Sequence, residues 1–504
     1  MSILTTKTAM RKRETGRFSL TAAVSLLVFA GCKVGPDYKS PESEMPDAWH
    51  QELTKGLAQG EPDFQTWWTL LDDPALNDLI QLAAQGNLDL ETAFARIVQA
   101  RAALGIASGE RYPLIETGGT AERFRSSKET TPFIPPGTSR TDNLFQNGVD
   151  ASWEVDIFGR IRRSVESADA SLEASVEAYR DVLVLLYAEV AFSYVEARAL
   201  QERIRLARAN IEVQRATLQL VQSRFDLDLV GELDVRQAEL NLANTQSALP
   251  TLRILLTQTI HRLGVLLGKR PSALHPTLAK RAPIPKAPPQ ITVGLPAQLL
   301  RQRPDIRQAE RQLAAQTALI GVATADLYPR FTLSGTLALE ANQVGNLYDA
   351  SSTYAFGIGP SLRWNLFSGG RIQGNIQLED ARTQQTLLAY EQTVLLALEE
   401  VENAMVAYVQ EVDRRDTLTR SVEAAEKSVD LVQTLYKEGL TDFQNVLDTQ
   451  RSLFQQQDQL ASSQGQVTQN VVRIYKSLGG GWSVGEGGAA AGAGVENTGE
   501  SNRS

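Results

Sequence analysis

Apolar positions recur with a 3.5-residue period along two long stretches of the chain, 160–227 and 370–437. The seam positions follow one another at steps of four and three: Leu200, Ile204, Ala207 and Ile211 in the first stretch, and Val394, Leu398, Val401, Met405, Tyr408 and Val412 in the second. Such a seam is typical of a coiled coil. At about 1.5 Å per residue, a helix over 160–227 would be ~100 Å long, far longer than a globular domain needs. The pattern therefore predicts two very long coiled-coil helices.

Shorter helical segments flank the long ones. Pro113 and Pro329 each end one of these segments, because proline cannot continue an α-helix. The shorter helices are predicted over 75–110, 233–268, 304–327 and 443–478.

Four runs alternate between apolar and polar side chains, as strands do. Three of them are regular, at 145–157, 331–339 and 353–366, whereas 114–124 is less regular. In 353–366 one face carries Tyr354, Phe356, Ile358, Leu362, Trp364 and Leu366, and the other carries Thr353, Gly357, Ser361, Arg363 and Asn365. Strands of about ten residues with one apolar face are typical of a membrane β-barrel with lipid outside and water inside. A half-buried sheet in a soluble domain is the alternative.

The same order of elements occurs twice: helix, two strands, long helix, helix. A shift of 216 residues places Asp89, Gly105, Tyr112 and Pro113 on Asp305, Gly321, Tyr328 and Pro329. A shift of 211 places Trp153, Gly159, Arg160 and Val235 on Trp364, Gly370, Arg371 and Val446. The change of shift is confined to the segment between Pro113 and Trp153, where strands and a loop are predicted. The chain is therefore interpreted as an internal duplication.

The duplication organises the whole chain. The fold class predicted is mostly α with a small β part. The segments are a signal peptide at 1–31, an extended arm at 32–66, a first repeat at 67–268, a proline-rich linker at 269–296, a second repeat at 297–478, and a disordered glycine-rich tail at 479–504.

The composition argues against several kinds of function. Fifty Lys+Arg against 59 Asp+Glu give a net charge of −9, which argues against nucleic acid as a partner. A single cysteine excludes an intrachain disulfide and a CxxC site, and three histidines leave little for a metal or catalytic cluster. No P-loop or GxSxG motif is present. We therefore expect no catalytic residues, no metal site and no cofactor.

The N-terminus reads as a secretory signal. A basic region precedes an apolar run from Leu20 to Phe29, and the only cysteine, Cys32, follows Ala30 and Gly31. This arrangement resembles a bacterial lipobox, so Cys32 is predicted to carry a covalent lipid. Phe29 departs from the Leu or Val that is usual three residues before the cysteine, and Lys33 is not the Asp that commonly retains lipoproteins at the inner membrane. A chance cysteine in an ordinary signal is the alternative, and Met10 is a second candidate start.

The number of strands indicates an oligomer. A membrane barrel needs about eight strands or more, since an open edge in lipid leaves backbone groups unpaired. The four candidate runs of one chain cannot close such a barrel. Two chains would make eight strands and three would make twelve, and strand counting leaves the number open.

Four segments together resemble the outer-membrane efflux protein family of the TolC type, in its lipoprotein branch that includes OprM and the NodT-like proteins. They are Cys32–Tyr38 with Pro41 and Trp49, Gly294–Pro296 with Arg303–Ile306, Trp364–Phe367 with Gly369–Arg371, and Tyr436 with Gly439–Thr441 and Val446–Asp448. The resemblance implies a homotrimer with a twelve-stranded barrel in the outer membrane, anchored in its lipid, and a helical barrel in the periplasm. It implies a passive exit duct for drugs or other small toxic compounds, not an enzyme. The implied partners are a periplasmic adaptor and an inner-membrane pump of the resistance-nodulation-division class.

The resemblance also implies a periplasmic gate at the turns 225–235 and 436–448. The gate residues carried over are Asp234, Asp448, Tyr436 and Asn445, the last at a position where the family has an aspartate. Helix-capping or solvated carboxylates, and a seam residue for Tyr436, are the alternatives. Adaptor contacts are expected at Leu229, Val230, Gly439, Leu440 and Thr441.

Two other functions stay open from the sequence. One is a secretion duct for proteins or peptides, and the other is a periplasmic coiled-coil structural lipoprotein without a pore. The sequence does not identify the exported compounds or the pump and adaptor with which the chain works.

Overall fold

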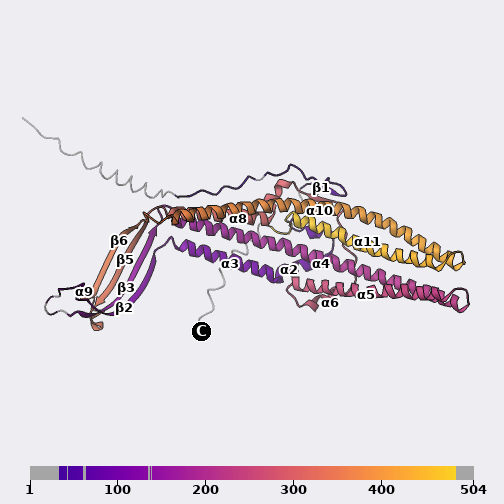
Figure 1. Cartoon of the computed structure of the whole chain (residues 1–504), viewed down its shortest axis with the longest axis horizontal. Coiled ribbons are helices and arrows are strands. Elements are labelled where there is room, and N and C mark those ends of the chain that lie inside the picture. The colour runs from indigo at the N-terminus through magenta and orange to yellow at the C-terminus, as the bar shows by residue number, and fades with distance from the viewer. Residues whose placement is uncertain are drawn as a thin grey trace, which may run out of the picture. The chain divides into compact units, whose positions relative to one another are not determined.

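The computed structural model describes residues 33–483 apart from 43, 61–63, 134, 136 and 138 (Figure 1). The predicted signal peptide, Cys32 and residues 484–504 lie outside the described residues. Among the helices of the described residues, none combines the length and the apolar content that crossing a membrane requires. The elements, in chain order, are β1 (Leu57–Gln59), η1 (Trp67–Leu71), α2 (Pro74–Gly86), α3 (Leu88–Gly109), β2 (Leu114–Arg125), β3 (Thr141–Val155), α4 (Arg160–Asp226), α5 (Glu232–Leu266), η2 (Pro271–Leu274), α6 (His275–Leu278), β4 (Ile291–Val293), η3 (Pro296–Gln298), α7 (Leu299–Gln302), α8 (Pro304–Ala325), β5 (Arg330–Ala341), η4 (Val344–Asn346), α9 (Ala350–Thr353), β6 (Tyr354–Arg363), α10 (Arg371–Lys437) and α11 (Phe443–Ser477).

The chain divides into two compact units, each assembled from three stretches of sequence. The first unit comprises residues up to 41, 99–173 and 310–388, and it contains the four long strands. The second comprises 42–98, 174–309 and the residues from 389 onward, and it contains most of the long helices. Both units therefore draw on both predicted repeats.

In the first unit, β2, β3, β5 and β6 form one antiparallel sheet in that order (Figure 1). The register places Thr117, Val149, Leu337 and Phe356 in one row across the four strands. The next row holds Glu116, Asp150, Thr336 and Gly357, and there the Thr336 hydroxyl donates to the Asp150 carboxylate at 2.7 Å. Because side chains alternate along each strand, one face of the sheet is apolar and the other polar.

The apolar face of this sheet is largely exposed in the part of the chain that the structure describes. Phe356 and Ile358 of β6 are 72% and 78% exposed, and Leu337 of β5 is exposed beside them. The predicted alternation is confirmed over Tyr354–Arg363, whereas Thr353 lies in α9 and residues 364–366 follow the end of β6. Strands β2 and β6 form the two edges of the sheet, each hydrogen-bonded to only one neighbouring strand.

The strands of both repeats are fastened to the preceding helix in the same way. The indole Nε1 of Trp153 donates to the Arg111 carbonyl at 2.9 Å, and that of Trp364 donates to the Leu327 carbonyl at 3.0 Å. Trp364 follows Trp153 by 211 residues and Leu327 follows Arg111 by 216, the two shifts found in the sequence. The repeats therefore share contacts as well as sequence.

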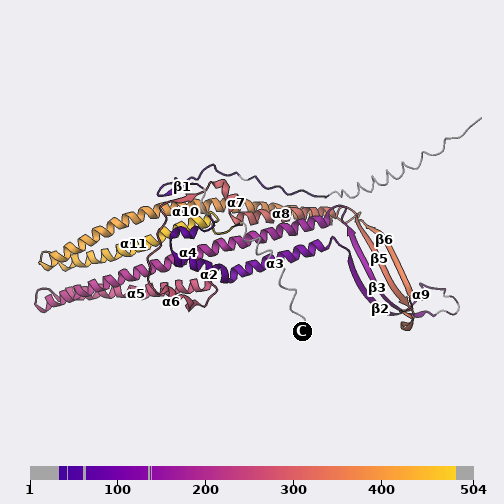
Figure 2. The same ribbon diagram turned by 180° about the vertical axis from the view of Figure 1, so that it is seen from behind.

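In the second unit the long helices form two hairpins, α4 with α5 and α10 with α11 (Figure 2). Both hairpins join a helix of 67 residues to one of 35 residues. Seam residues of α4, Leu200 and Ile204, are buried against Leu252 of α5, as the heptad pattern predicts. Helices α4, α10 and α11 begin and end within one residue of the predicted bounds, and α5 within two, inside the usual uncertainty of helix ends.

A further core in this unit joins η1, α2, α4 and α11, which are far apart in the sequence. Trp67 of η1 stacks on Tyr475 of α11 with ring centroids 5.7 Å apart, and both side chains are fully buried. The Tyr194 hydroxyl of α4 donates to the Asp73 carboxylate at 2.7 Å. That same carboxylate accepts from the first amides of α2 and caps this helix.

Two features differ from the expectations. The helix predicted over 75–110 is divided at Asn87, whose side chain accepts from the Leu90 amide and donates to the Leu266 carbonyl at 2.8 Å. Asn87 ends α2 and caps α3, because its side-chain oxygen accepts from the first turn of α3 while its side-chain amide donates to the end of α5. The first residues of the predicted tail are also packed. The Arg180 guanidinium lies over the Trp482 ring, 4.6 Å from its centroid, and the Trp482 indole Nε1 donates to the Gln302 carbonyl.

Candidate functional site

The turns that close the two helical hairpins have the same backbone geometry. At the end of α10, the Leu440 amide donates to the Leu435 carbonyl at 2.9 Å and the Gly439 amide to the Tyr436 carbonyl at 3.0 Å. At the end of α4, the amides of Leu229 and Asp228 make the equivalent pair of bonds. This pattern is a Schellman motif, which satisfies the last carbonyls of a helix.

The motif needs a left-handed residue, and the two repeats supply it differently. Gly439 has φ +76° and Asp228 has φ +54°. Glycine adopts this conformation without a steric penalty, and aspartate tolerates it better than most residues do. At a shift of 211 Asp228 stands at the position of Gly439, and both residues have the left-handed conformation although only one of them is a glycine.

The following helices begin without side-chain caps. Gly231 precedes α5 and Asp442 precedes α11, both in extended conformation. Asp442 occupies the N-cap position of α11, but its carboxylate makes no capping hydrogen bond to this helix.

An apolar cluster lies between the two turns, which we call the turn cluster. Tyr436 and Phe443 pack at its centre with ring centroids 5.4 Å apart. The Tyr436 hydroxyl is buried and has no hydrogen-bond partner among the described residues. The buried members of the turn cluster are Val221, Val235, Ala238, Tyr436, Phe443, Val446 and Leu447.

Arg224 joins the two hairpins at this cluster, and the sequence analysis did not identify it. Its Nη1 donates to the Tyr436 carbonyl at 2.6 Å, and its guanidinium lies 4.7 Å from the centroid of the Tyr436 ring. A cation near the last carbonyls of a helix is favourable, and so is a guanidinium over an aromatic face. The position equivalent to Arg224 in the second repeat is Leu435, so the duplication contains no signal for this contact.

The predicted carboxylates occupy separate surroundings. Asp234 lies half-buried in the first turn of α5, where burial and the negative charge of Asp442 raise the pKa of its carboxyl. Asp448 is exposed on α11, where it accepts from Gln444 at 3.0 Å and lies 3.7 Å from Arg451. Within one chain, Asp234 is therefore coupled to Asp442 and not to Asp448.

Asn445 and the predicted contact residues lie at the exterior of the turns. The Asn445 amide donates to the Thr441 hydroxyl at 2.9 Å. Leu229 and Leu440, at equivalent positions of the two repeats, are 62% and 73% exposed, and Val230 is half-buried. Gly439 is exposed, and a Cβ added to it would meet no atom within 4 Å. The turns therefore present two exposed leucines on a rigid backbone.

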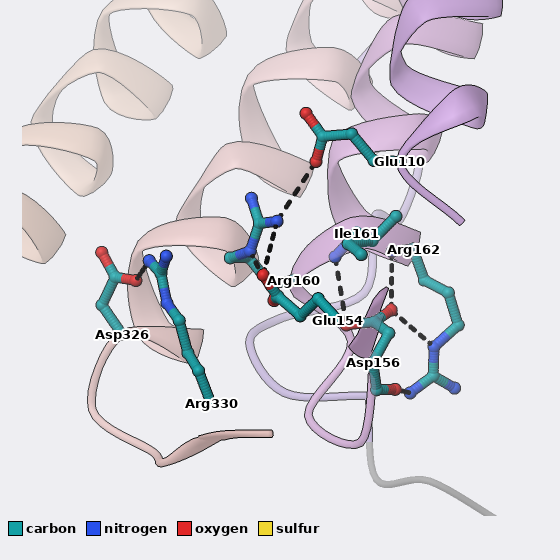
Figure 3. Close-up of polar contacts among 8 residues, drawn as sticks. All are labelled: Glu110, Glu154, Asp156, Arg160, Ile161, Arg162, Asp326 and Arg330. Atoms are coloured by element: carbon teal, nitrogen blue, oxygen red, sulfur yellow. Dashed lines mark hydrogen bonds and ion pairs between the residues drawn. The ribbon is translucent and has the colours of Figure 1, made fainter. Parts of the chain in front are cut away.

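A second polar site lies in the first unit, where β3 leads into α4 (Figure 3). Arg160 donates to both oxygens of Glu154, at 2.9 and 3.1 Å, and to Glu110 at 3.2 Å. Such a bidentate pair fixes the orientation of the guanidinium. The first turn of α4 is thereby tied to the end of β3 and to the residue that follows α3.

The Asp156 carboxylate completes this junction. It accepts from the backbone amides of Ile161 and Arg162 at 3.1 and 2.9 Å, and the Arg162 side chain bonds back to it (Figure 3). A carboxylate at a helix N-terminus satisfies free amides and is favoured by the helix dipole. In the second repeat, Asn365 and Phe367 stand at the positions of Glu154 and Asp156, so that junction lacks these bonds.

Another ion pair, Asp326 with Arg330, lies where α8 leads into β5 (Figure 3). It joins residues four apart across the turn and is largely exposed. Exposed pairs of this kind contribute about 0.2–1 kcal/mol. The pair therefore positions the turn more than it stabilises the unit.

The segment that follows Cys32 is held by Arg163, which is fully buried. Its guanidinium donates to the Val34 carbonyl at 3.0 Å and to the Gly35 carbonyl at 2.9 Å. Lys33, the first described residue, forms an ion pair with Glu166 at 2.6 Å. The chain is therefore fixed against the first turn of α4 from the residue next to Cys32 onward.

Among the described residues, no group of three or more His, Cys, Asp and Glu side chains could hold a metal ion. The site residues at the turns are instead suited to packing, hydrogen bonding and the attraction of cations.

The sequence and the fold of this chain are similar to those of known proteins. The family model described as outer membrane efflux protein matches residues 79–269 and 295–480. Nodulation protein T of Rhizobium leguminosarum bv. trifolii is 32% identical over 458 residues, which cover 90% of this chain and 94% of that protein. The solvent efflux pump outer membrane protein SrpC of Pseudomonas putida is 32% identical over 485 residues, with coverages of 93% and 99%. The outer-membrane channel OprN has a TM-score of 0.83 and 36% identity, and the match covers 90% of this chain and 100% of that chain. With both repeats matched and the fold shared, the chain belongs to the outer membrane efflux protein family.

Proposed function

We propose that three copies of this chain form the exit duct of a tripartite efflux system. The observation that carries the proposal is the four-stranded sheet, with one exposed apolar face and two edges that have no partner strand among the described residues. Family membership makes the chain an outer-membrane efflux duct component, and its relatives are named as efflux pump components.

Strand counting together with the duct function favours three chains over two. In lipid every backbone hydrogen-bonding group needs a partner, so the free edges of β2 and β6 must be paired with other chains. Pairing β6 of one chain with β2 of the next closes a barrel. Eight strands from two chains would enclose a lumen that side chains fill, whereas twelve leave an aqueous passage. The polar face with Glu116 and Asp150 would line that passage, and Phe356 and Ile358 would face lipid.

The cargo is proposed to be small organic compounds. The relatives are named for solvent efflux and for pyoverdine export, which are chemically different cargoes. A passive duct accommodates both because selection lies with the proteins that deliver the cargo. A periplasmic adaptor and an inner-membrane pump of the resistance-nodulation-division class are proposed to deliver it.

A lipid on Cys32 would reinforce the position of the duct. The contacts of Lys33, Val34 and Gly35 hold the chain beside Phe158 and Gly159, between β3 and α4. A lipid chain attached one residue earlier would start from the end of the proposed membrane sheet. Mass spectrometry of protein extracted from membranes tests this proposal, and a free thiol on Cys32 would reject it.

The hairpin turns are proposed to form the periplasmic gate. Three copies of Asp234 and Asp448 would surround a narrow passage and attract cations, with Tyr436 and Asn445 beside them. The double substitution Asp234→Ala and Asp448→Ala should weaken divalent-cation block of single-channel current. Block that is unchanged in the double variant would reject the assignment.

The exposed leucines are proposed to contact the adaptor. Photo-crosslinkers at Leu229 and Leu440 should capture a periplasmic adaptor in cells. Leu395 on α10 is an equally exposed leucine distant in sequence from the turns and serves as the matched control. Equal capture at Leu395, or none at either turn, would contradict the contact.

Planar-bilayer recording together with mass photometry tests the duct as a whole. A species with the mass of three chains should carry ionic current, and monomers should carry none. A stable trimer without conductance would instead favour a coiled-coil structural lipoprotein.

A further inference from the structure

Two of the three histidines of the chain, His261 and His275, are in contact in the second unit although they lie 14 positions apart in the sequence. The Nε2 atoms of His261 and His275 are 3.2 Å apart. Their rings are inclined by 75°, with centroids 5.3 Å apart, and both side chains are half-buried. The sequence pattern does not pair them, because one lies in a helix and the other follows the proline-rich linker's first turn.

The fold holds this pair in place through the turn that ends α5. The Lys269 amide donates to the Gly264 carbonyl at 2.8 Å, and Gly268 has φ +65°. Gly264 faces the returning backbone so closely that an added Cβ would lie 3.0 Å from the Arg270 carbonyl oxygen and 3.1 Å from Pro271. The absence of a side chain at Gly264 therefore allows η2 to pack against α5 one turn from His261.

Buried leucines fix the position of His275. Leu274 and Leu278 flank it in sequence and are both in the main apolar core of the unit. The His275 carbonyl accepts from the Ala279 amide at 2.9 Å, which fixes the backbone at the start of α6. Both imidazoles are therefore presented by backbone that is already ordered.

The spacing of the two nitrogens fits a shared metal ion. Imidazole binds Zn²⁺ at about 2.0–2.1 Å, so two imidazoles on one tetrahedral ion have nitrogens roughly 3.3 Å apart. The observed separation of 3.2 Å is close to this value, and without an ion the same contact is a hydrogen bond in which one Nε2–H donates to the other Nε2. Imidazole nitrogen is a ligand that suits zinc, copper and nickel, whereas magnesium and calcium prefer oxygen.

We propose that His261 and His275 form a binding site for one divalent transition-metal ion, Zn²⁺, Ni²⁺ or Cu²⁺, held by the two Nε2 atoms. Water completes the coordination, since the half-buried rings remain open to solvent and the described residues supply no third ligand of the His, Cys, Asp or Glu type. An ion held by two protein ligands exchanges with solution, unlike the ion of a closed structural site. The adjacent Arg262 is paired with Glu189 at 3.4 Å, which reduces its repulsion of a cation.

Bound metal would fasten α5 to α6 and so clamp the start of the segment that joins the two repeats. Because a ligand that binds only the folded protein stabilises it, the ion should raise the temperature of unfolding. The site does not depend on the proposed duct, and it can be tested with the purified chain.

The test is calorimetric titration of the full chain in detergent, without a polyhistidine tag, using ZnCl₂ and NiCl₂. We expect one ion per chain for the wild type. His261→Gln and His275→Gln should each weaken binding at least about tenfold, a loss of the size seen when a metal site loses a supporting group. Glutamine retains hydrogen-bonding ability at either position but lacks the imidazole nitrogen.

The third histidine provides the matched control. His50 is exposed, and only its backbone amide is seen to bond, to Glu402. His50→Gln should bind zinc as the wild type does, and zinc should raise the unfolding temperature of both but of neither pair variant. With Cu²⁺, electron paramagnetic resonance should show coupling to two imidazole nitrogens. No binding by the wild type, or equal binding by the pair variants and the wild type, would overturn the proposal. Unfolding temperatures measured in EDTA verify that the variants are folded.

Discussion

Replacing Arg224 should loosen the contact between the two hairpin turns. This arginine leaves the end of α4 and reaches α10, where its Nη1 donates to the Tyr436 carbonyl at 2.6 Å and its guanidinium covers the Tyr436 ring. Arg224→Met keeps an unbranched side chain of similar reach and removes both contacts. If opening of the proposed gate separates the turns, the variant should open more readily.

The magnitude follows from the two contacts that are lost. A hydrogen bond from a charged donor contributes about 1.5–3 kcal/mol. A cation–π contact at a partly exposed site adds about 0.5–1 kcal/mol. Against this, the Arg224 Nε is buried without a partner, and that cost disappears in the variant. We therefore expect a net loss of about 2 kcal/mol, which is roughly a 30-fold shift in the equilibrium between closed and open turns.

Single-channel recording in planar bilayers measures this shift as open probability. Arg215 provides the control, since it lies on the same helix in an exposed ion pair with Glu212 at 2.7 Å. Such pairs contribute about 0.3–0.5 kcal/mol, so Arg215→Met should change open probability by no more than about twofold. Hydrogen exchange of the amides in 436–443 should be faster only in Arg224→Met. If the two variants show the same open probability, the proposed role of Arg224 is wrong.

Three further outcomes are expected. Burial and the repulsion of Asp305 raise the pKa of Asp181 to about 6, so its ionised form destabilises the fold above that pH and the penalty vanishes below its ordinary value of 3.8. Asp181→Asn should therefore raise the free energy of unfolding by up to about 3 kcal/mol at pH 8, with a higher unfolding temperature, and should not do so at pH 4. Equal increments at both pH values would contradict this. Gly439→Ala should lower the free energy of unfolding by about 1–2 kcal/mol, the cost of a left-handed alanine in the turn after α10, whereas Gly374→Ala inside α10 should raise it by about 0.5–1 kcal/mol. Calorimetry that ranks the two variants otherwise would refute the turn geometry. Arg163→Met should free the arm, so that trypsin cleaves after Lys33 at least about tenfold faster, and an unchanged rate in timed digests would show that other contacts hold the arm.

The sequence determined the features that depend on neighbouring residues. The heptad seam fixed the extent of α4 and α10, the alternation in 353–366 fixed which side chains of β6 share a face, and Gly439 marked the end of a helix. These patterns are readable because helix and strand periods, and the conformational freedom of glycine, act within a few residues. The two shifts of 211 and 216 then carried each assignment from one repeat to the other.

The tertiary structure decided what the sequence separates. The break at Asn87 depends on the Leu266 carbonyl, Arg224 reaches Tyr436 across 212 residues, and Arg163 holds the arm across nearly 130. His261 and His275 meet only because Gly264 admits the returning chain. Each of these contacts joins side chains to groups brought near by packing, and no local period encodes such a pairing. The sequence by itself therefore determined the elements and the family pattern, and the fold decided which polar groups could act together.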